Sequence, residues 1–195
     1  MNEFIDKLLP LEHDLFLALN GSGSAFWDDA MWTFTGIVTW IPIFLFILYI
    51  TFRNQQAKEA MLILLSIVLV LVLANITSSL FFKPLFKRDR PTYHPSFIDS
   101  VTVINDFRGG HYGFISGHAT NSFALALLFT KLFRNKLVTG AMFVWAILTS
   151  YSRIYLGVHF ISDILGGILF GIMIGQFVYY IYRRTREKYY KESFS

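Results

Sequence analysis

Several apolar segments of this chain are long enough to cross a lipid bilayer as helices. A transmembrane helix needs about 20 predominantly apolar residues, and in lipid it satisfies all of its own backbone hydrogen bonds. Only 15% of the 195 residues are charged, whereas a typical soluble domain contains about 25%. The sequence therefore predicts an all-α fold: a polytopic membrane helical bundle of about five transmembrane helices, in a single domain covering residues 1–195. The expected spans are residues 32–52, 60–82, 115–133, 137–155 and 160–182.

The segment 1–29 has a different pattern from the apolar spans. Phe4, Leu8 and Leu15 recur at roughly helical spacing among acidic residues, and Pro10 interrupts the pattern. This arrangement is typical of a broken amphipathic helix that lies in the membrane interface. We also expect no cleavable signal peptide, because the segment is acidic and amphipathic instead of basic and then apolar.

Basic residues indicate how the bundle is oriented. Lysine and arginine are concentrated in segments 53–58, 131–136 and 183–195, and five spans would place all three on one membrane face. Short cytoplasmic loops carry an excess of these residues, so we expect that face to be cytoplasmic and the tail 183–195 to be interfacial or disordered. The long connection 83–114 then lies on the outer face, where its own cations need another explanation.

The most informative polar stretch is SRIYLGVHFISD, residues 152–163, which lies between two apolar spans. It carries Arg153, His159 and Asp163, and ionisable residues at the edge of hydrocarbon are costly and usually functional. If a helix begins near residue 158, His159 and Asp163 share a face at four-residue spacing. The carboxylate would then fix the imidazole tautomer and leave the other ring nitrogen free to attack an electrophile.

Three cations are predicted to reach the same membrane face as this stretch. Lys83, Arg90 and Arg153 together suit a dianionic phosphate and its transition state. Because these cations would neutralise the charge, we expect no metal ion and no cofactor. The other basic residues of the long loop are expected to contact lipid headgroups or solvent; they are Lys87, Arg88 and Arg108.

A third cluster opens the predicted span 115–133. Ser116 and Gly117 precede the helix, where free backbone N–H groups and the helix dipole form an anion site. The next residue is His118. Of the two histidines, His118 and His159, one could attack phosphorus while the other protonates the leaving oxygen.

Other features of the sequence have simpler interpretations. The polar end of the second span, residues 75–79, favours interhelical hydrogen bonding over a role in lining a site. His94 and His111 match no metal-ligand pattern, and the chain has no cysteine for a disulfide or a thiolate site. Glycines at four-residue intervals from Gly167 to Gly175 predict the close approach of a neighbouring helix.

The order and spacing of these residues resemble the signature motifs of a known family. Between residues 83 and 163 the chain contains K-x6-RP, then SGH, then SR-x5-H-x3-D. In this order they resemble the three motifs of the type 2 phosphatidic acid phosphatase superfamily, which also includes vanadium haloperoxidases. The apolar spans favour the membrane-bound branch, and Ile115 stands where the second motif usually has proline. The matching residues are Lys83, Arg90 and Pro91, then Ser116, Gly117 and His118, then Ser152, Arg153, His159 and Asp163.

The resemblance implies a role for each of these side chains. His159 would be the nucleophile that forms a phosphohistidine, Asp163 would orient it, and His118 would protonate the departing alcohol. The phosphate oxygens would be held by Lys83, Arg90, Ser116, Gly117 and Arg153.

The expected function is hydrolysis of a phosphomonoester or diphosphate on a membrane lipid, at the outer face of the cytoplasmic membrane. Lipids of the undecaprenyl diphosphate, phosphatidylglycerophosphate, phosphatidic acid and lipid A types all remain candidate substrates, and a nucleic-acid partner is not expected. Two other classes stay open: a vanadate-dependent peroxidase, and a non-catalytic membrane protein that binds lipid phosphate.

Overall fold

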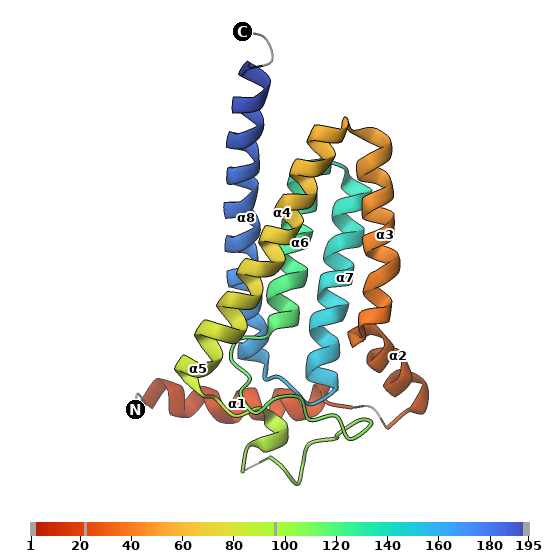
Figure 1. Ribbon diagram of the computed structural model, residues 1–195. Coiled ribbons are helices and arrows are strands. Elements are labelled where there is room, and N and C mark those ends of the chain that lie inside the picture. The colour runs from red at the N-terminus through yellow and green to blue at the C-terminus, as the bar shows by residue number, and fades with distance from the viewer. Residues whose placement is uncertain (1–2, 22, 96, 193–195) are drawn as a thin grey trace.

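The computed structural model describes residues 3–21, 23–95 and 97–192. Apart from one isolated β-bridge, the regular structure in this part of the chain is helical, which confirms the all-α prediction (Figure 1). Helices α3, α4, α6, α7 and α8 form a bundle, and α1 crosses one of its ends. The elements are α1 (Glu3–Leu19), α2 (Ala25–Thr35), α3 (Ile37–Asn54), α4 (Ala57–Asn75), the π-helix η1 (Ile76–Phe82), α5 (Lys83–Phe86), the 3₁₀ helix η2 (Pro91–Tyr93), α6 (Gly117–Phe133), α7 (Lys136–Tyr155) and α8 (Ile161–Glu192).

The helix lengths are those of a multi-pass membrane protein. In the described part of the chain, three stretches are long and apolar enough to span a bilayer: Ala57–Phe86, Lys136–Tyr155 and Ile161–Lys188. Helices α2 and α3, bent by 45°, make a fourth if they count as one span. The bend falls at Gly36, whose backbone is extended, and Pro42 lies inside α3. The first long helix therefore begins at Ile37 and not at residue 32 as predicted.

Helix α6 lies at the centre of the bundle and contacts α4, α7 and α8. Its 17 residues make it shorter than the three candidate spans. The predicted close approach of a helix to the glycine ladder is confirmed at this contact. A Cβ atom added at Gly167, Gly171 or Gly175 would lie 2.7, 2.6 or 2.5 Å from a backbone oxygen of the α6 segment. Only residues without a side chain allow the two backbones to pack so closely.

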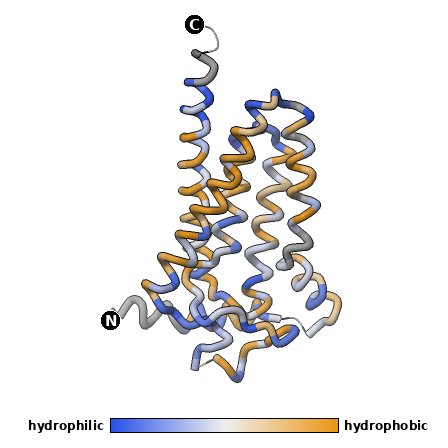
Figure 2. Tube along the Cα trace, in the orientation of Figure 1, coloured by the Kyte–Doolittle hydropathy of each residue, from blue (hydrophilic) through white to orange (hydrophobic). Residues whose placement is uncertain are grey.

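Apolar side chains lie both inside and outside this bundle. The interior is a continuous cluster that includes Val70, Phe123, Leu128 and Val178. Figure 2 shows apolar colouring along the helix shafts and polar colouring at the helix ends and loops. Such a broad apolar exterior is a liability in water but fits hydrocarbon. The outward-facing residues include Leu65, Val68, Ile147, Leu169 and Phe177.

Helix α8 is longer than the predicted fifth span. It continues through the basic tail as far as Glu192, so a disordered tail, one of the two predicted alternatives, is wrong for the described part of it, and an interfacial position stays a prediction. Two contacts support the extension: Arg183 pairs with Glu187 one turn later, and Arg186 pairs with the buried Glu59 of α4. Residues 193–195 lie outside the described residues.

The other end of the bundle carries α1 and the long loop after α5. The predicted break at Pro10 is wrong, because α1 is one helix from Glu3 to Leu19 with Pro10 inside it. Phe16 of α1 is fully buried, and its ring packs against those of Phe97 and Phe160. This second, smaller core holds the loop and the start of α8 against α1.

Candidate active site

A cavity of about 660 Å³ opens where η1, α6 and α7 meet the long loop. Its lining combines several loop residues with polar side chains from separate helices. The predicted convergence of polar groups from the ends of separate spans is therefore seen at this cavity. Six of the eight predicted site residues line it, namely Lys83, Arg90, Gly117, His118, Arg153 and His159. The other two, Asp163 and Ser116, are fully buried behind this lining.

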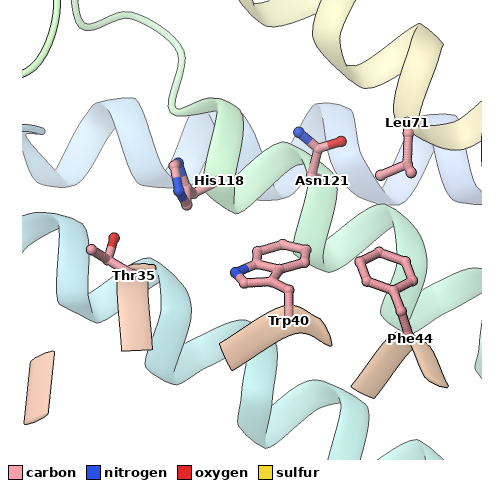
Figure 3. Close-up of a pocket in the computed structure, with 6 residues that line it drawn as sticks. All are labelled: Thr35, Trp40, Phe44, Leu71, His118 and Asn121. Atoms are coloured by element: carbon pink, nitrogen blue, oxygen red, sulfur yellow. The ribbon is translucent and has the colours of Figure 1, made fainter. Parts of the chain in front are cut away.

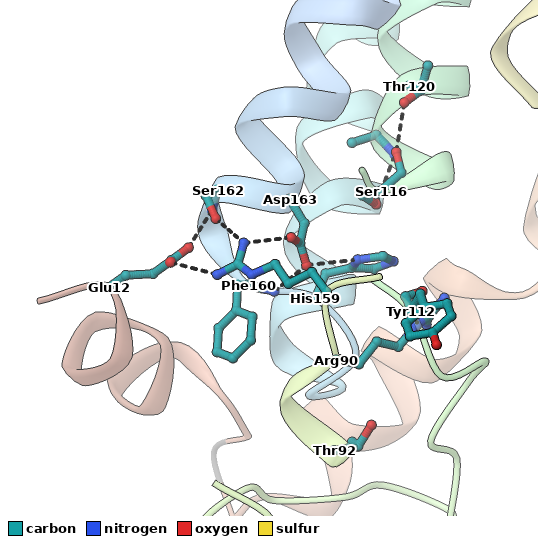
Figure 4. Close-up of polar contacts among 12 residues, drawn as sticks. Glu12, Arg90, Thr92, Tyr112, Ser116, Thr120, His159, Phe160, Ser162 and Asp163 are labelled. Carbon is teal, nitrogen blue, oxygen red and sulfur yellow. Dashed lines mark hydrogen bonds and ion pairs between the residues drawn. The ribbon is translucent and has the colours of Figure 1, made fainter. Parts of the chain in front are cut away.

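His159, which lines the cavity, forms a buried pair with Asp163 behind it, and Figure 4 shows the contact between the two side chains. His159 Nδ1 lies 3.3 Å from Asp163 Oδ2, and the same carboxylate oxygen accepts the Phe160 N–H at 3.0 Å. The pairing was predicted from a helix beginning near residue 158. The helix begins at Ile161 instead, because Gly157 has a positive φ of 73° and the chain turns there. Asp163 thus reaches back from the first turn of α8 to the imidazole that precedes it.

The surroundings of His159 favour its neutral form. Burial lowers the pKa of His159 well below its usual range, and the nearby charges of Arg90, Arg153 and Lys83 lower it further. A hydrogen bond with the Gly113 backbone partly opposes these effects. If Nδ1 carries the proton that faces Asp163, the neutral ring has its lone pair on Nε2, which is the form a nucleophile needs.

Three cations face the cavity without a carboxylate partner. Among the described residues, none forms an ion pair with Lys83, Arg90 or Arg153. Arg153 is only 4% exposed; it donates to Thr35 Oγ1, but its Nε has no hydrogen-bond partner in the described chain. Burying an unpaired guanidinium donor is costly unless a ligand supplies the acceptor. The cavity is therefore prepared for an anion.

The loop around Gly109 makes room for Arg90. The Arg90 side chain is 6% exposed, and its Nε donates to the Tyr112 carbonyl at 3.2 Å. Gly109 has a positive φ of 68°, and a Cβ there would lie 2.3 Å from Arg90 Nη1. Burial lowers the pKa of Arg90, while the nearby Asp163 carboxylate opposes this effect. An arginine remains charged under such conditions, so the cavity keeps this positive charge.

Helix α6 begins two residues after the predicted start at residue 115, and Gly117, which was expected to precede the helix, is its first residue. Ser116 is its N-cap. The Ser116 hydroxyl accepts a hydrogen bond from the Ala119 N–H at 3.5 Å, so it serves the helix end and does not line the cavity. Gly117 does line it, and a Cβ there would lie 3.2 Å from Ser78 Oγ.

His118 lies where the polar cavity meets a second, largely apolar pocket of about 380 Å³ (Figure 3). Asn121, one turn further along α6, also lines both spaces. The remaining walls of the second pocket come from α2, α3 and α4, and they are Thr35, Trp40, Phe44 and Leu71. A group bound beside His118 can thus extend from a cationic site into apolar surroundings.

Sequence reasoning missed two contributions to this site. The polar end of the second span forms the π-helix η1, and Asn75, Ser78 and Ser79 line the cavity, although interhelical bonding had been favoured for them. Short π-helical segments frequently occur at functional sites.

Arg88 had been assigned to headgroups or solvent, but its Nη1 lies 2.8 Å from Asp163 Oδ1. Arg88 and Arg90 are two apart on an extended segment, where alternate residues share a face; this signal was available only once that conformation was known.

Other loop residues lie away from the cavity or at its rim. His111 is exposed and pairs with Asp89 at 3.0 Å. Arg108 lines the mouth of the cavity and donates to the Thr92 carbonyl. No group of three or more histidine, aspartate or glutamate side chains in the described chain is placed to hold a metal ion.

A buried histidine beside a cavity lined by unpaired cations, at one end of a helical membrane bundle, suits the transfer of a phosphoryl group from a lipid. The chain belongs to the PAP2 superfamily, which residues 60–187 match. The sequence-based assignment to this superfamily is therefore confirmed.

Two relatives agree with this assignment, and one solved structure shows a similar fold. The chain is 42% identical to a lipid A 4'-phosphatase of Porphyromonas gingivalis over 184 residues, which is 93% of this chain and 78% of that protein. It is 38% identical to a lipid A 4'-phosphatase of Bacteroides thetaiotaomicron over 91% of this chain and 79% of that protein. Its fold is similar to the crystal structure of Aquifex aeolicus LpxE, with a TM-score of 0.64 and 24% identity over 86% of this chain and 94% of that one.

Proposed function

We propose that this protein is a lipid A 4'-phosphatase that works through a phosphohistidine intermediate without a metal ion. The observation that carries the proposal is the junction at His118 of two spaces, one cationic and one apolar. A phosphate monoester of a lipid matches both, because its dianionic group needs the cations and its apolar part needs a dry surface. Two relatives named lipid A 4'-phosphatase, similar over more than nine-tenths of this chain, favour this lipid.

The reaction begins with the phosphate held between Lys83, Arg90 and Arg153. His159 Nε2 attacks phosphorus, the bond from phosphorus to the ester oxygen breaks, and the leaving oxygen takes a proton from the protonated form of His118. Asp163 stabilises the cationic imidazole that forms, as the carboxylate of a catalytic triad does. Negative charge shifts among the phosphoryl oxygens in the transition state, where the three cations are most effective.

The second half of the reaction uses the same groups in reverse. A water molecule gives a proton to His118 and attacks the phosphohistidine, the bond between nitrogen and phosphorus breaks, and inorganic phosphate leaves. His159 returns to its neutral form with its Nδ1–H still directed at Asp163. The products are one phosphate ion and a lipid with a free hydroxyl group.

We further propose five spans, with α6 as the protected central one and the site on the outer face. The apolar residues of α6 are shielded by α4, α7 and α8, so a shorter helix suffices there. The basic ends of α3 and α8 and the segment joining α6 to α7 lie at the end of the bundle opposite the site (Figure 1). An excess of basic residues in short loops marks the cytoplasmic face.

The test is phosphate release from bisphosphorylated lipid A by the purified protein in detergent with EDTA. We expect one phosphate per lipid, with fragmentation mass spectrometry locating the loss at the 4' position. His159→Ala is expected to lower the rate by about 10⁴-fold, whereas His111→Ala, which changes an exposed histidine outside the cavity, leaves it unchanged. Release from undecaprenyl diphosphate but not from lipid A would overturn the substrate assignment, and activity that depends on added divalent ions would overturn the metal-free mechanism.

A further inference from the structure

We propose that Arg88 and Glu12 are positioning residues, which hold Asp163 in the orientation that His159 requires and so make the docking of α1 part of the active site. This inference rests on the proposed function, in which His159 is the nucleophile. It extends the site from the cavity to a helix none of whose described residues lines that cavity.

Both carboxylate oxygens of Asp163 have hydrogen-bond partners. Its Oδ2 is occupied by His159 Nδ1 and the Phe160 N–H. Its Oδ1 lies 2.8 Å from Arg88 Nη1, and among the described residues this is the only hydrogen bond or ion pair of that oxygen. A fully buried carboxylate needs a cation and hydrogen bonds on both oxygens to remain charged. Arg88 therefore fixes the rotation of the carboxylate that orients His159.

The Arg88 guanidinium is itself held in place by several side chains. Its Nη2 lies 2.9 Å from Glu12 Oε2, and its guanidinium carbon lies 4.5 Å from the centre of the Phe160 ring. Nη1 also donates to Ser162 Oγ. A guanidinium placed between two carboxylates and over an aromatic face has little freedom to turn.

Glu12 connects α1 to the start of α8. Its Oε2 accepts from Arg88, and its Oε1 accepts the Ser162 N–H at 2.7 Å (Figure 4). That N–H lies in the first turn of α8, where an anion is favoured by the helix dipole. Glu12 thus holds both Arg88 and the turn that carries Asp163.

The position of α1 gives this connection a physical context. Phe16 anchors the helix to the protein, while Leu11 and Leu15 are 66% and 50% exposed on it. Exposed leucines on a helix that crosses the end of a membrane bundle are suited to the headgroup region. The exposed leucines of α1 are thus available to the membrane surface, while Glu12 of the same helix connects it to Asp163 through Arg88.

The test compares phosphate release by the wild-type protein with that of Arg88→Ala, Arg88→Lys and Glu12→Gln. We expect Arg88→Ala to lower kcat by about 10- to 100-fold with KM nearly unchanged. Arg88→Lys should recover part of the loss, and Glu12→Gln should lower kcat by about 3- to 10-fold.

In the double variant Glu12→Gln/Arg88→Ala, the loss of kcat should equal that of Arg88→Ala alone, because Glu12 acts through Arg88. Arg183→Ala, which breaks an exposed pair with Glu187 at the far end of α8, is the matched control and should leave kcat unchanged.

A spectroscopic measurement separates positioning from a merely structural ion pair. The ¹⁵N shifts of labelled histidines, with the His159 signals assigned by their loss in His159→Gln, report which ring nitrogen carries the proton. We expect a single tautomer in the wild type and a mixture in Arg88→Ala and Glu12→Gln. An unchanged tautomer in both variants, or an unchanged kcat in Arg88→Ala while His159→Ala is inactive, would overturn the inference. Retained activity in His159→Ala would instead overturn the proposed function.

Discussion

The two ends of the bundle each bury a carboxylate beside an arginine, yet only one of them is built for chemistry. At the end with the cavity, Asp163 contacts Arg88 and a buried imidazole. At the opposite end, Glu59 is 5% exposed, accepts a hydrogen bond from the Tyr182 hydroxyl, and lies 3.0 Å from Arg186 Nε.

The difference lies in how completely the charges are paired. The carboxylate of Glu59 has a phenol and a guanidinium as partners, and Arg186 remains half exposed to the surroundings. At the cavity, Lys83, Arg90 and Arg153 have no carboxylate partner among the described residues. An excess of one charge sign around a cavity is costly for folding and favourable for a ligand of the opposite sign. The comparison thus separates a functional cluster from a structural one by its unpaired charges.

Among changes that would test the difference between the two ends, we expect the largest loss of activity from Gly109→Ala at the cavity end. The new methyl group would lie 2.3 Å from Arg90 Nη1, and the backbone φ of 68° is unfavourable for alanine. The Arg90 guanidinium must leave its present position in the cavity wall, so we expect kcat/KM for phosphate release to fall by about 10- to 100-fold. Gly110→Ala is the matched control, because a Cβ there meets nothing within 4 Å. Equal rates in the two variants would show that the exact place of Arg90 does not matter.

The second prediction concerns the structural end. Glu59→Ala removes the partner of a buried tyrosine hydroxyl, so we expect the free energy of unfolding to fall by about 1–3 kcal/mol. The rate of phosphate release should stay within about twofold of the wild type at a permissive temperature. Thermal unfolding in detergent measures the first effect and phosphate release the second. Glu187→Ala is the control, since its exposed pair with Arg183 should contribute little to stability. A loss of activity in folded Glu59→Ala protein would contradict the separation of the two ends.

The sequence predicted the functional end better than the structural end, for a physical reason. Cations that face a cavity leave a local excess of positive charge, so they stand out in a mostly apolar chain. Lys83, Arg90 and Arg153 could be recognised in this way, because they lie at or just beyond the ends of apolar segments. The pair of Glu59 with Arg186 was not predicted, because the two residues are far apart in the chain and each lies in a polar segment where a charged residue is ordinary. Only the length of α8 brings them together.

The position of Arg88 could not be predicted for a related reason. Its partners Glu12 and Asp163 lie 76 and 75 positions away in the chain, and the docking of α1 depends on ring contacts of Phe16 that have no motif. The helix start after His159 was also misplaced, since Gly157 can continue or turn the chain with equal ease. Tertiary contacts decided both cases.

The smallest expected effect is a dependence of stability on pH that belongs to the cavity end. Burial and the neighbouring cations lower the pKa of His159 in the folded protein, so the unfolded chain binds a proton there below about pH 6.5 while the folded one does not. Stability contributed by neutral His159 is therefore complete above about pH 6.5 and declines as the pH falls toward the folded pKa, by at most about 1.4 kcal/mol per pH unit.

This dependence can be isolated by comparing the wild type with His159→Gln. Burial and the nearby His94 also lower the pKa of His13, so the total slope has more than one source, but His13 contributes to both proteins alike. We expect denaturant unfolding between about pH 5 and about pH 7 to give a flatter slope in His159→Gln. The Glu59→Ala variant should keep the wild-type slope at lower overall stability, because it leaves the imidazole and its cations in place. Equal slopes of unfolding free energy against pH in the wild type and His159→Gln would mean that His159 binds a proton as readily in the folded protein as in the unfolded chain. That result would contradict the proposed electrostatic difference between the two ends of the bundle.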